Sequence, residues 1–392
     1  MRKKLKDVCM FYSGTGFPIQ YQGQTKGEYP FYKVGDIANN AIAGKIYLEL
    51  CNNYISSDVA KMIKGCILPK DTVVFAKIGE ALKLNRRAIT SCDCLIDNNA
   101  MGIAPKIDFL RIQYFYFCMK NLKMQTLAES TTVPSVRKTV LEKYEIEVPS
   151  LVEQEEIEKK LTLTQKIIEK RRQELSYLDE IIKARFVEMF GDPIQNPKGW
   201  EVVTIGDIVT EVRYGTSKPA VEGGKYPYLR MNNLTADGHL DLNDLKYIDI
   251  PDDEIEKCVV RKGDVLFNRT NSIELVGKTA VFDLPEDMII AGYIIRVRLT
   301  EKMLPEVLSQ YMNLEALKGI LRGMAKGAVN QANINAQELQ SIKVYIPEME
   351  LQKQFVKMKE QIYKSKFDTM TFAPIYAIIN LYLHTYFYQG RR

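Results

Sequence analysis

Residues and motifs that carry metal or catalytic chemistry are scarce in this sequence. Histidine occurs only twice, at His239 and His384, in unrelated surroundings. The seven cysteines form no Cys-x-x-Cys pair, and Cys92-x-Cys94 is too tight for the usual zinc spacing. We therefore expect no metal site, and we interpret the cysteines as free thiols of a reducing cytoplasm.

Recognisable catalytic signatures are missing too. The sequence has no Asn-Pro-Pro-Phe or Asp-Pro-Pro-Tyr stretch of the kind found in adenine-amino methyltransferases. It also has no Gly-x-x-x-x-Gly-Lys-Ser/Thr loop to hold a nucleotide triphosphate. We expect a chain that performs no chemistry itself, binds no cofactor and acts through partners. A nuclease or methyltransferase with an unrecognised site remains an alternative, and so does a coiled-coil adaptor that never touches DNA.

Long apolar segments are equally rare. The basic N-terminus lacks the apolar core of a signal peptide. The segment 371–388 is uncharged and close to the length that spans a bilayer, but Pro374, Asn380 and His384 argue against a span. We expect a cytoplasmic protein without membrane contact. The net charge of +5 permits a polyanionic partner without establishing one.

The two halves of the chain repeat each other, and 392 residues suffice for two or three domains. The matching segments occur in the same order: Tyr29–Ile37 with Tyr226–Leu234, Lys70–Lys77 with Lys262–Arg269, and Ile146–Pro149 with Val344–Pro347. Gln154 and Gln352 follow the two prolines at the same distance. Apolar runs predict strands at 72–76, 264–267 and 287–298, and helices at 109–127 and 306–324. The repeat indicates a mixed α/β (α+β) fold with two duplicated globules.

A heptad pattern joins the globules. Apolar residues recur every seven positions at Leu161, Ile168, Leu175, Ile182 and Met189. This spacing predicts one helix from Leu151 to Phe190, about 60 Å long at 1.5 Å per residue. The second copy has apolar residues at alternating spacings of four, three and four, which add up to the same heptad: Leu351, Phe355, Met358 and Ile362. The predicted divisions are 1–150, 151–192, 193–348, 349–368 and an atypical apolar tail, 369–392.

Together these features resemble the specificity subunit of type I restriction–modification systems over about residues 1–366. The stretch 178–193 (LDEIIKARFVEMFGDP) and the two Pro–Gln endings carry the resemblance most strongly, and residues 77–89 add to it. The resemblance implies two target-recognition domains separated by antiparallel coiled-coil helices. Each domain would read one half of a bipartite double-stranded DNA target.

The resemblance also implies partner subunits. Two methylation subunits would dock on the helices, usually with two restriction subunits outside them. S-adenosylmethionine, ATP and Mg²⁺ would bind to those partners, which would supply adenine methylation and ATP-dependent cleavage. The length of the spacer helix should set the gap between the half-sites, because the duplex turns once per about 34 Å.

The C-terminal end departs from the family pattern after Lys366. The expected helical continuation is replaced by a segment containing Pro374. Our interpretation is a frameshift, a recombination event or a truncation. We expect the end of the long helix near Ile182 and Met189 to lack its partner, and assembly with methylation subunits to be weakened.

Candidate DNA contacts are basic and amide side chains in polar stretches between apolar runs, since such groups bond phosphates and base edges. In the first globule they are Lys77, Lys83, Asn85, Arg86 and Arg87. In the second they are Asn268, Arg269, Asn271, Ser272 and Lys278, followed later by Lys326, Asn330, Gln331 and Asn333. We expect both stretches to be loops on a rigid sheet. The later group, and its counterpart at 130–135, could equally cap the helix that follows.

Overall fold

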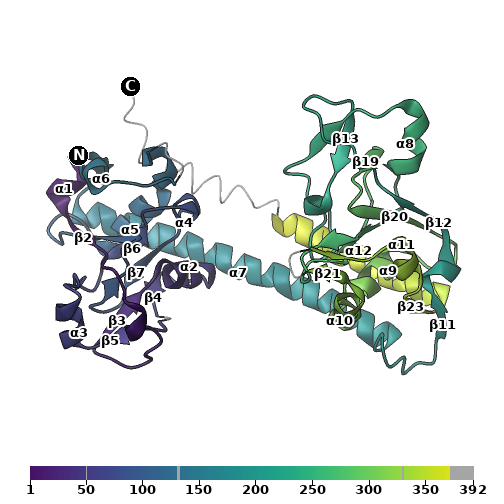
Figure 1. Ribbon diagram of the computed structural model, residues 1–392, viewed down its shortest axis with the longest axis horizontal. Helices are drawn as coiled ribbons and strands as arrows, with labels where there is room; N and C mark the ends of the chain where they lie inside the picture. Colours follow the sequence, from purple (N-terminus) through teal and green to yellow (C-terminus); the bar gives the residue numbers. More distant parts are fainter. Residues whose placement is uncertain (50, 130–132, 329–330, 371–392) are drawn as a thin grey trace. The chain divides into compact units, whose positions relative to one another are not determined.

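The computed structural model describes residues 1–49, 51–129, 133–328 and 331–370. The chain divides into unit 1, Met1–Lys170, and unit 2, which begins at Arg171. Both contribute to one helix, α7 (Leu151–Phe190), which confirms the predicted long helix (Figure 1).

Unit 1 has a mostly antiparallel main sheet in the order β2-β9-β6-β7-β4 and a smaller sheet in the order β5-β3-β8. The main strands are Cys9–Ser13, Ala100–Pro105, Val73–Ala76, Arg87–Thr90 and Tyr47–Leu48; the smaller sheet has Tyr54–Ile55, Tyr29–Tyr32 and Leu95–Ile96. A separate pair joins β1 (Arg2–Lys4) to β10 (Glu145–Glu147). The helices are α1 (Leu5–Val8), α2 (Val34–Ile42), α3 (Ser57–Met62), α4 (Glu80–Lys83), α5 (Ile112–Asn121) and α6 (Lys138–Lys143).

Unit 2 has sheets in the orders β12-β20-β16-β18 and β14-β13-β19-β15. Their strands are Val209–Tyr214, Ile294–Leu299, Val265–Asn268 and Thr279–Val281, then Lys246–Ile248, Tyr226–Leu229, Met288–Ile290 and Val259–Val260. A small sheet joins β17 (Thr270–Asn271), β22 (Gln331–Asn333) and β21 (Lys326–Ala328), and β11 (Glu201–Thr204) pairs with β23 (Lys343–Ile346). The helices are α8 (Asp252–Cys258), α9 (Pro305–Met312), α10 (Glu315–Met324), α11 (Ala336–Gln340) and α12 (Met349–Met370).

The sheets confirm the duplication. The order β2-β9-β6-β7 matches β12-β20-β16-β18, and β5-β3-β8 matches β14-β13-β19. Strand directions agree as well: β3–β8 and β13–β19 are both parallel, whereas β2–β9 and β12–β20 are both antiparallel. One αβ scaffold has therefore been used twice.

Three predicted elements are interrupted. The predicted strand 287–298 is two strands, β19 and β20, separated by a turn in which Ile294 N donates to Ala291 O. The predicted helix 306–324 breaks into α9 and α10, because the Asn313 amide bonds to Ser309 O and Thr279 O and Leu314 is extended. The predicted helix 109–127 ends at Asn121, after which Leu122 is extended and a 3₁₀ turn follows.

The two matching glutamines, Gln154 and Gln352, hold the start of α7 to unit 1 and the start of α12 to unit 2. Gln154 Oε1 accepts from Arg111 N, and its Nε2 donates to Phe109 O and Pro149 O at 2.8–2.9 Å. Gln352 repeats this pattern: Oε1 accepts from Leu304 N at 2.9 Å, and Nε2 donates to Lys302 O and Pro347 O. Both side chains are fully buried. The position needs one acceptor and two donors, which only an amide provides at this length.

We expect Gln154→Leu and Gln352→Leu each to lower the free energy of unfolding of their unit by about 2–3 kcal/mol. Leucine has a similar volume but leaves buried backbone N–H and C=O groups unpaired. The exposed Gln173 on α7 provides the matched control, and Gln173→Leu should change stability by less than about 0.5 kcal/mol. Denaturant unfolding measures both. Equal effects at all three glutamines would contradict a structural role for the amide pattern.

Helix α12 runs antiparallel to the end of α7. Phe355, near the start of α12, packs against Phe186 and Phe190 with ring centroids 5.3 and 5.4 Å apart. Further along, Lys366 Nζ pairs with Asp179 at 2.5 Å. The expectation that α7 lacks a partner near Ile182 and Met189 is therefore wrong. In an antiparallel pair the beginning of the second helix covers the end of the first. Among the described residues, α12 therefore covers the end of α7 and leaves its middle largely exposed.

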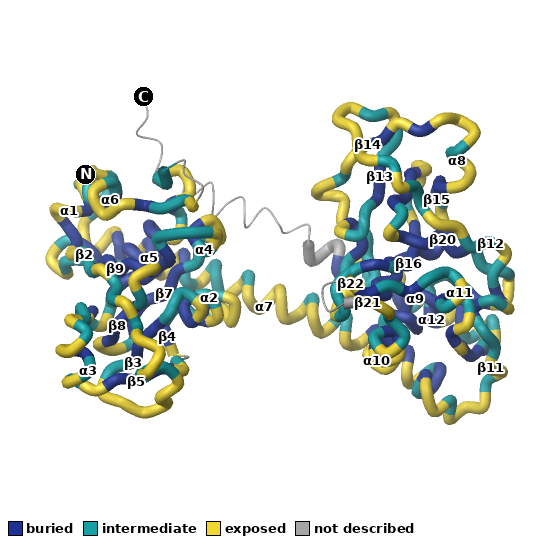
Figure 2. The backbone as a smooth tube through the Cα atoms, viewed as in Figure 1, coloured by how far each residue is buried: buried dark blue, intermediate teal, exposed yellow. Residues whose placement is uncertain are grey.

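The seam residues accordingly divide among different environments. Ile182 and Phe355 are buried in the core of unit 2, with Met189, Leu351, Met358 and Ile362 partly buried against it. Leu161 instead belongs to the core of unit 1. Ile168 and Leu175 are half-buried in a largely exposed stretch of α7 (Figure 2). Of the predicted apolar tail 369–392, residues 371–392 lie outside the described residues, and 369–370 end α12. Within the described part of the chain, no helix has both the length and the apolarity to cross a bilayer.

Candidate nucleic-acid interface

Four loop segments converge in unit 1, held by backbone hydrogen bonds. Lys77 N donates to Asn99 O at 2.8 Å, and Val136 N donates to Lys77 O at 2.9 Å. Thr15 N donates to Ile96 O at 2.9 Å. We call this surface the loop face of unit 1 and define it by residues 14–15, 77–79, 97–99 and 134–136. It brings Lys77, a predicted DNA contact, beside residues 134–135 of the segment 130–135, which the sequence analysis also considered.

Unit 2 builds the same arrangement from equivalent residues. Arg269 N donates to Tyr293 O, Ile334 N to Arg269 O, and Thr216 N to Ile290 O, each at 2.9 Å. The loop face of unit 2 consists of residues 215–216, 269–271, 291–293 and 332–334. Here β17 pairs with β22, so Asn271 of the first group of candidate residues lies on one small sheet with Lys326, Gln331 and Asn333 of the later group.

A glycine permits the close approach in each loop face. A Cβ atom on Gly14 would lie 1.7 Å from Asp97 O, and one on Gly215 would lie 2.2 Å from Ile290 O. No side chain fits at such distances, so glycine is required where the strand end meets the neighbouring loop. The two loop faces therefore share a tightly constrained backbone.

The side chains at equivalent positions differ. Where unit 1 has Ser13, Lys77 and Asn99, unit 2 has Tyr214, Arg269 and Tyr293. The Tyr214 and Tyr293 side chains are 44% and 49% exposed, so neither serves as core. A shared backbone with different exposed side chains is suited to reading two different sequences from one scaffold.

Sequence reasoning missed Asn99, Tyr214 and Tyr293. Tyr293 lies within the run 287–298 that predicts a strand, and Tyr214 ends β12, a strand that was not predicted. An alignment of the two halves, extended beyond the segments that match, would have been needed to place Tyr214 opposite Ser13 and Tyr293 opposite Asn99. Side chains that diverge inside a conserved frame give no repeat signal of their own.

Several predicted contacts of unit 1 lie elsewhere than expected. Lys83 and Arg87 belong to α4 and β7, so the loop prediction is wrong for both. Arg87 is buried, and its Nη2 donates to Leu122 O at 2.8 Å and Asn85 Oδ1 at 2.7 Å. Burial lowers the pKa of its guanidinium to about 10. Asn85 also bonds Lys120 O and Met124 N. Arg87 and Asn85 thus join β7 to the end of α5.

The remaining candidates of unit 1 are accessible. Lys83 is exposed and pairs with Glu80 at 2.6 Å, while Lys77 and Arg86 are half-buried. Ile78 bridges to Ser135, which brings the stretch 134–136 beside Lys77. The other residues of that stretch, 130–132, lie outside the described residues.

In unit 2, Asn268 and Lys278 are buried and internally bonded. The Asn268 amide donates to Thr270 O and Tyr293 O at 3.1 Å, and Asn271 donates to Asn268 Oδ1 at 2.8 Å. Lys278 Nζ donates to Met231 O at 2.8 Å and Leu234 O at 2.5 Å, and burial lowers its pKa. The expectation of an exposed loop is wrong for Asn268, which ends β16, and for Lys278.

The late candidates of unit 2 lie on the β21–β22 ribbon. Lys326 is largely exposed and pairs with Glu338 at 2.5 Å, and Gln331 is exposed. Asn333 Oδ1 accepts from the Thr270 hydroxyl at 2.8 Å. Asn330 lies outside the described residues. The helix cap after this ribbon is Asn335, which accepts from Glu338 N, so the ribbon side chains are not the cap.

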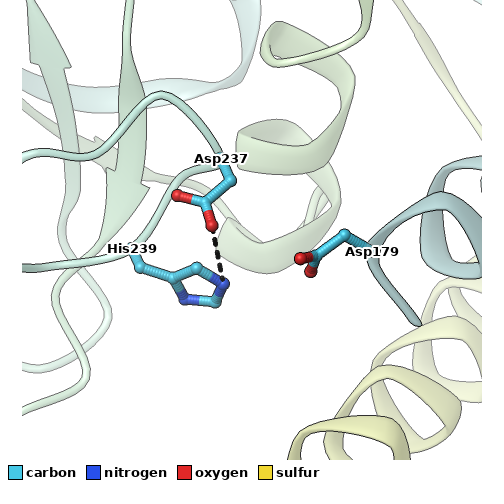
Figure 3. Close-up of side chains that lie close together, drawn as sticks. All are labelled: Asp179, Asp237 and His239. Atoms are coloured by element: carbon cyan, nitrogen blue, oxygen red, sulfur yellow. Dashed lines mark ion pairs between the residues drawn. The ribbon is translucent and has the colours of Figure 1, made fainter. Parts of the chain in front are cut away.

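One group in unit 2 has the residue types of a metal site. The ligand-type atoms of Asp179, Asp237 and His239 lie within 4.8 Å of one another (Figure 3). However, Lys366 already pairs with Asp179, and the buried Lys359 lies nearby, so two ammonium groups balance the two carboxylates. Burial lowers the pKa of the His239 imidazole, which favours its neutral form. The group is better suited to holding the loop around His239 against α7 and α12 than to binding a divalent cation.

Comparison with known proteins agrees with the duplicated fold. The family model "Type I restriction modification DNA specificity domain" matches residues 1–177 and again 197–374. The "Type I restriction enzyme EcoKI specificity subunit" of Escherichia coli is 24% identical over 257 residues, 62% of this chain and 55% of that protein. A "Putative type I restriction enzyme MjaX specificity subunit" of Methanocaldococcus jannaschii is 32% identical over 166 residues, 41% of this chain and 39% of that protein.

A solved structure supports the fold. The chain matches one described as "Structural basis underlying complex assembly and conformational transition of the type I R-M system" with a TM-score of 0.56 and 17% identity, covering 98% of this chain and 97% of that one. The alignments to the two curated relatives span only about half of those proteins or less. The family domain itself, however, covers most of this sequence in two copies, and the chain belongs to the type I restriction modification DNA specificity domain family.

Proposed function

We propose that this chain is the sequence-reading subunit of a type I restriction–modification complex. The observation that carries the proposal is the pair of loop faces. Each lies in one copy of a DNA specificity domain, and the two share backbone geometry but not side chains. Two different readers on one chain suit an asymmetric DNA target made of two short parts.

The contacts we assign to DNA are the accessible polar residues on or beside the loop faces. They are Lys77, Lys83, Arg86 and Asn99 in unit 1, and Arg269, Asn271, Lys326 and Gln331 in unit 2. Cations among them would bond phosphates and position each unit, while amides and arginine would bond base edges. Asn85, Arg87, Asn268 and Lys278 would support these residues from within, because their polar groups already have intramolecular partners.

The chemistry in this proposal belongs to partner subunits. Two methylation subunits would dock on α7 and α12 and bind S-adenosylmethionine, and two restriction subunits would bind ATP and Mg²⁺. Exposed apolar residues on α7, such as Leu163, Ile167 and Tyr177, offer surface for such docking. The whole complex would methylate adenine and cleave unmethylated DNA.

Methylation mapping of the host genome tests the proposal. Deleting the gene should abolish methylation at one motif made of two parts with an unspecified gap, and restoring the gene should bring it back. A methylation pattern that is identical with and without the gene would refute the proposal and favour an adaptor that does not touch DNA.

A further inference from the structure

We infer that the half-site of unit 2 contains a guanine read by Arg269. This inference rests on the proposed DNA-reading function and adds the identity of one base and the residue that selects it. It is carried by the way the loop face of unit 2 holds this one arginine.

The backbone of Arg269 is fixed on both sides. Its N–H donates to Tyr293 O, and its C=O accepts from Ile334 N, each at 2.9 Å. The preceding residue, Asn268, is fully buried and bonds across the same turn to Thr270 O and Tyr293 O. Three neighbouring segments therefore fix the Cα position of Arg269. A residue that binds a ligand in a defined geometry needs such a fixed backbone.

The side chain is held by an aromatic ring. The guanidinium carbon lies 5.1 Å from the centroid of Tyr214, and the Tyr214 hydroxyl accepts from Ala336 N at 2.8 Å, which anchors the ring. Stacking on a fixed ring restricts the guanidinium, so less conformational entropy is lost when its donors bond to a base.

The donors of Arg269 are underused. The other arginines from Arg213 to Arg322 each pair with a carboxylate: Arg213, Arg230, Arg261, Arg296, Arg298 and Arg322. Among the described residues Arg269 has no such partner, and its side chain donates one long bond, 3.4 Å from Nη1 to Gly292 O. A cation held in place without a counter-charge, on the loop face, is suited to an external acceptor.

Guanine is the base that fits this group. Its O6 and N7 atoms accept two parallel hydrogen bonds in the major groove, and the guanidinium supplies two parallel donors. Lysine cannot reproduce this fork, because its ammonium is a point charge. Unit 1 has Lys77 at the equivalent position, so the arginine fork at this position belongs to unit 2.

The test selects bound duplexes from a library of random sequence, using the full chain in the complex it forms with its partner subunits. Arg269→Lys keeps the charge and removes the fork. We expect it to reduce the preference for guanine at one position of one half-site by roughly 5- to 150-fold, with the salt dependence unchanged. Tyr214→Leu keeps the arginine but removes its support, and should weaken the same preference. Arg322→Lys, which lies off the loop face and pairs with Glu315, is the matched control and should leave the motif unchanged.

Two results would overturn the inference. If Arg269→Lys retains the full motif while Arg269→Ala weakens binding to all sequences alike, Arg269 contacts a phosphate. If both variants retain the motif and the affinity, the arginine does not touch DNA. Failure of the proposed function is distinguishable from either, since the unaltered chain would then enrich no motif at all.

Discussion

Replacing residues 1–150 with the corresponding segment of another family member changes one half of the methylated motif and leaves the other half intact. The physical reason is that each loop face is built within its own unit. Backbone bonds among residues 14–136 form the first, and bonds among residues 215–334 form the second. Each of these sets of bonds lies within one unit, so the two half-sites should be exchanged independently.

Methylation mapping of cells carrying the hybrid chain gives the result directly, and exchanging residues 193–348 serves as the reciprocal control. It should alter the other half only. A change in both halves, or in neither, would mean that the units do not read separately. A loss of all methylation with normal protein levels would instead indicate failed assembly, which a pull-down of the partner subunits detects.

The largest stability effect is expected for Phe355→Ala. Phe355 is fully buried, and its ring packs against Phe186 and Phe190 of α7. Removing an aromatic ring from such a core leaves a cavity and costs about 3–5 kcal/mol. The loss should unfold unit 2 at lower denaturant concentration and release α12 from α7.

The single tryptophan makes this effect measurable. Trp200 packs against the same core and donates from Nε1 to Phe190 O at 2.8 Å, so its fluorescence reports on this junction. Ile181→Ala on α7 is the control, because Ile181 is 46% exposed and its replacement should cost well under about 1 kcal/mol. Similar unfolding midpoints for the two variants would show that α12 contributes little to the unit.

The sequence predicted those parts of the fold that repeat or recur. Duplicated segments and a heptad pattern are carried by many residues, so the two units and α7 could be anticipated. Breaks at Asn313 and Gly292 could not, because each depends on a bond to a distant loop: Asn313 to Thr279 O and Gly292 to Thr216 O. The order of apolar and polar residues within one segment does not reveal hydrogen bonds to distant loops.

The candidate site was predicted only in part, for a related reason. A lysine or arginine in a polar stretch looks the same whether it meets solvent or buried carbonyl groups. Arg269 remained accessible, whereas Arg87 and Lys278 turned inward to bond carbonyls. The wrong expectation for α7 has another cause. An antiparallel pair was already expected from the resemblance, and it places the beginning of α12 on the end of α7, as the contact of Phe355 with Phe186 shows.

The departure of the C-terminal end from the family pattern stays a prediction, and the surface that it would affect is not the one first expected. Weakened docking of methylation subunits remains a prediction. The uncovered surface that follows from a short α12 is the middle of α7, where Leu163, Ile167 and Tyr177 are exposed, and not the end near Met189. Restoring a heptad pattern beyond residue 366 would therefore be expected to act on that stretch.

The most direct test of the account is a gel-shift titration of the complex on its own motif against a duplex of the same composition with both half-sites scrambled. Sequence reading by the two loop faces predicts that the motif binds at least about 1,000-fold more tightly at physiological salt, with affinity for both duplexes falling steeply as salt rises. Equal affinity for the two duplexes at every salt concentration would contradict the claim that this chain reads DNA.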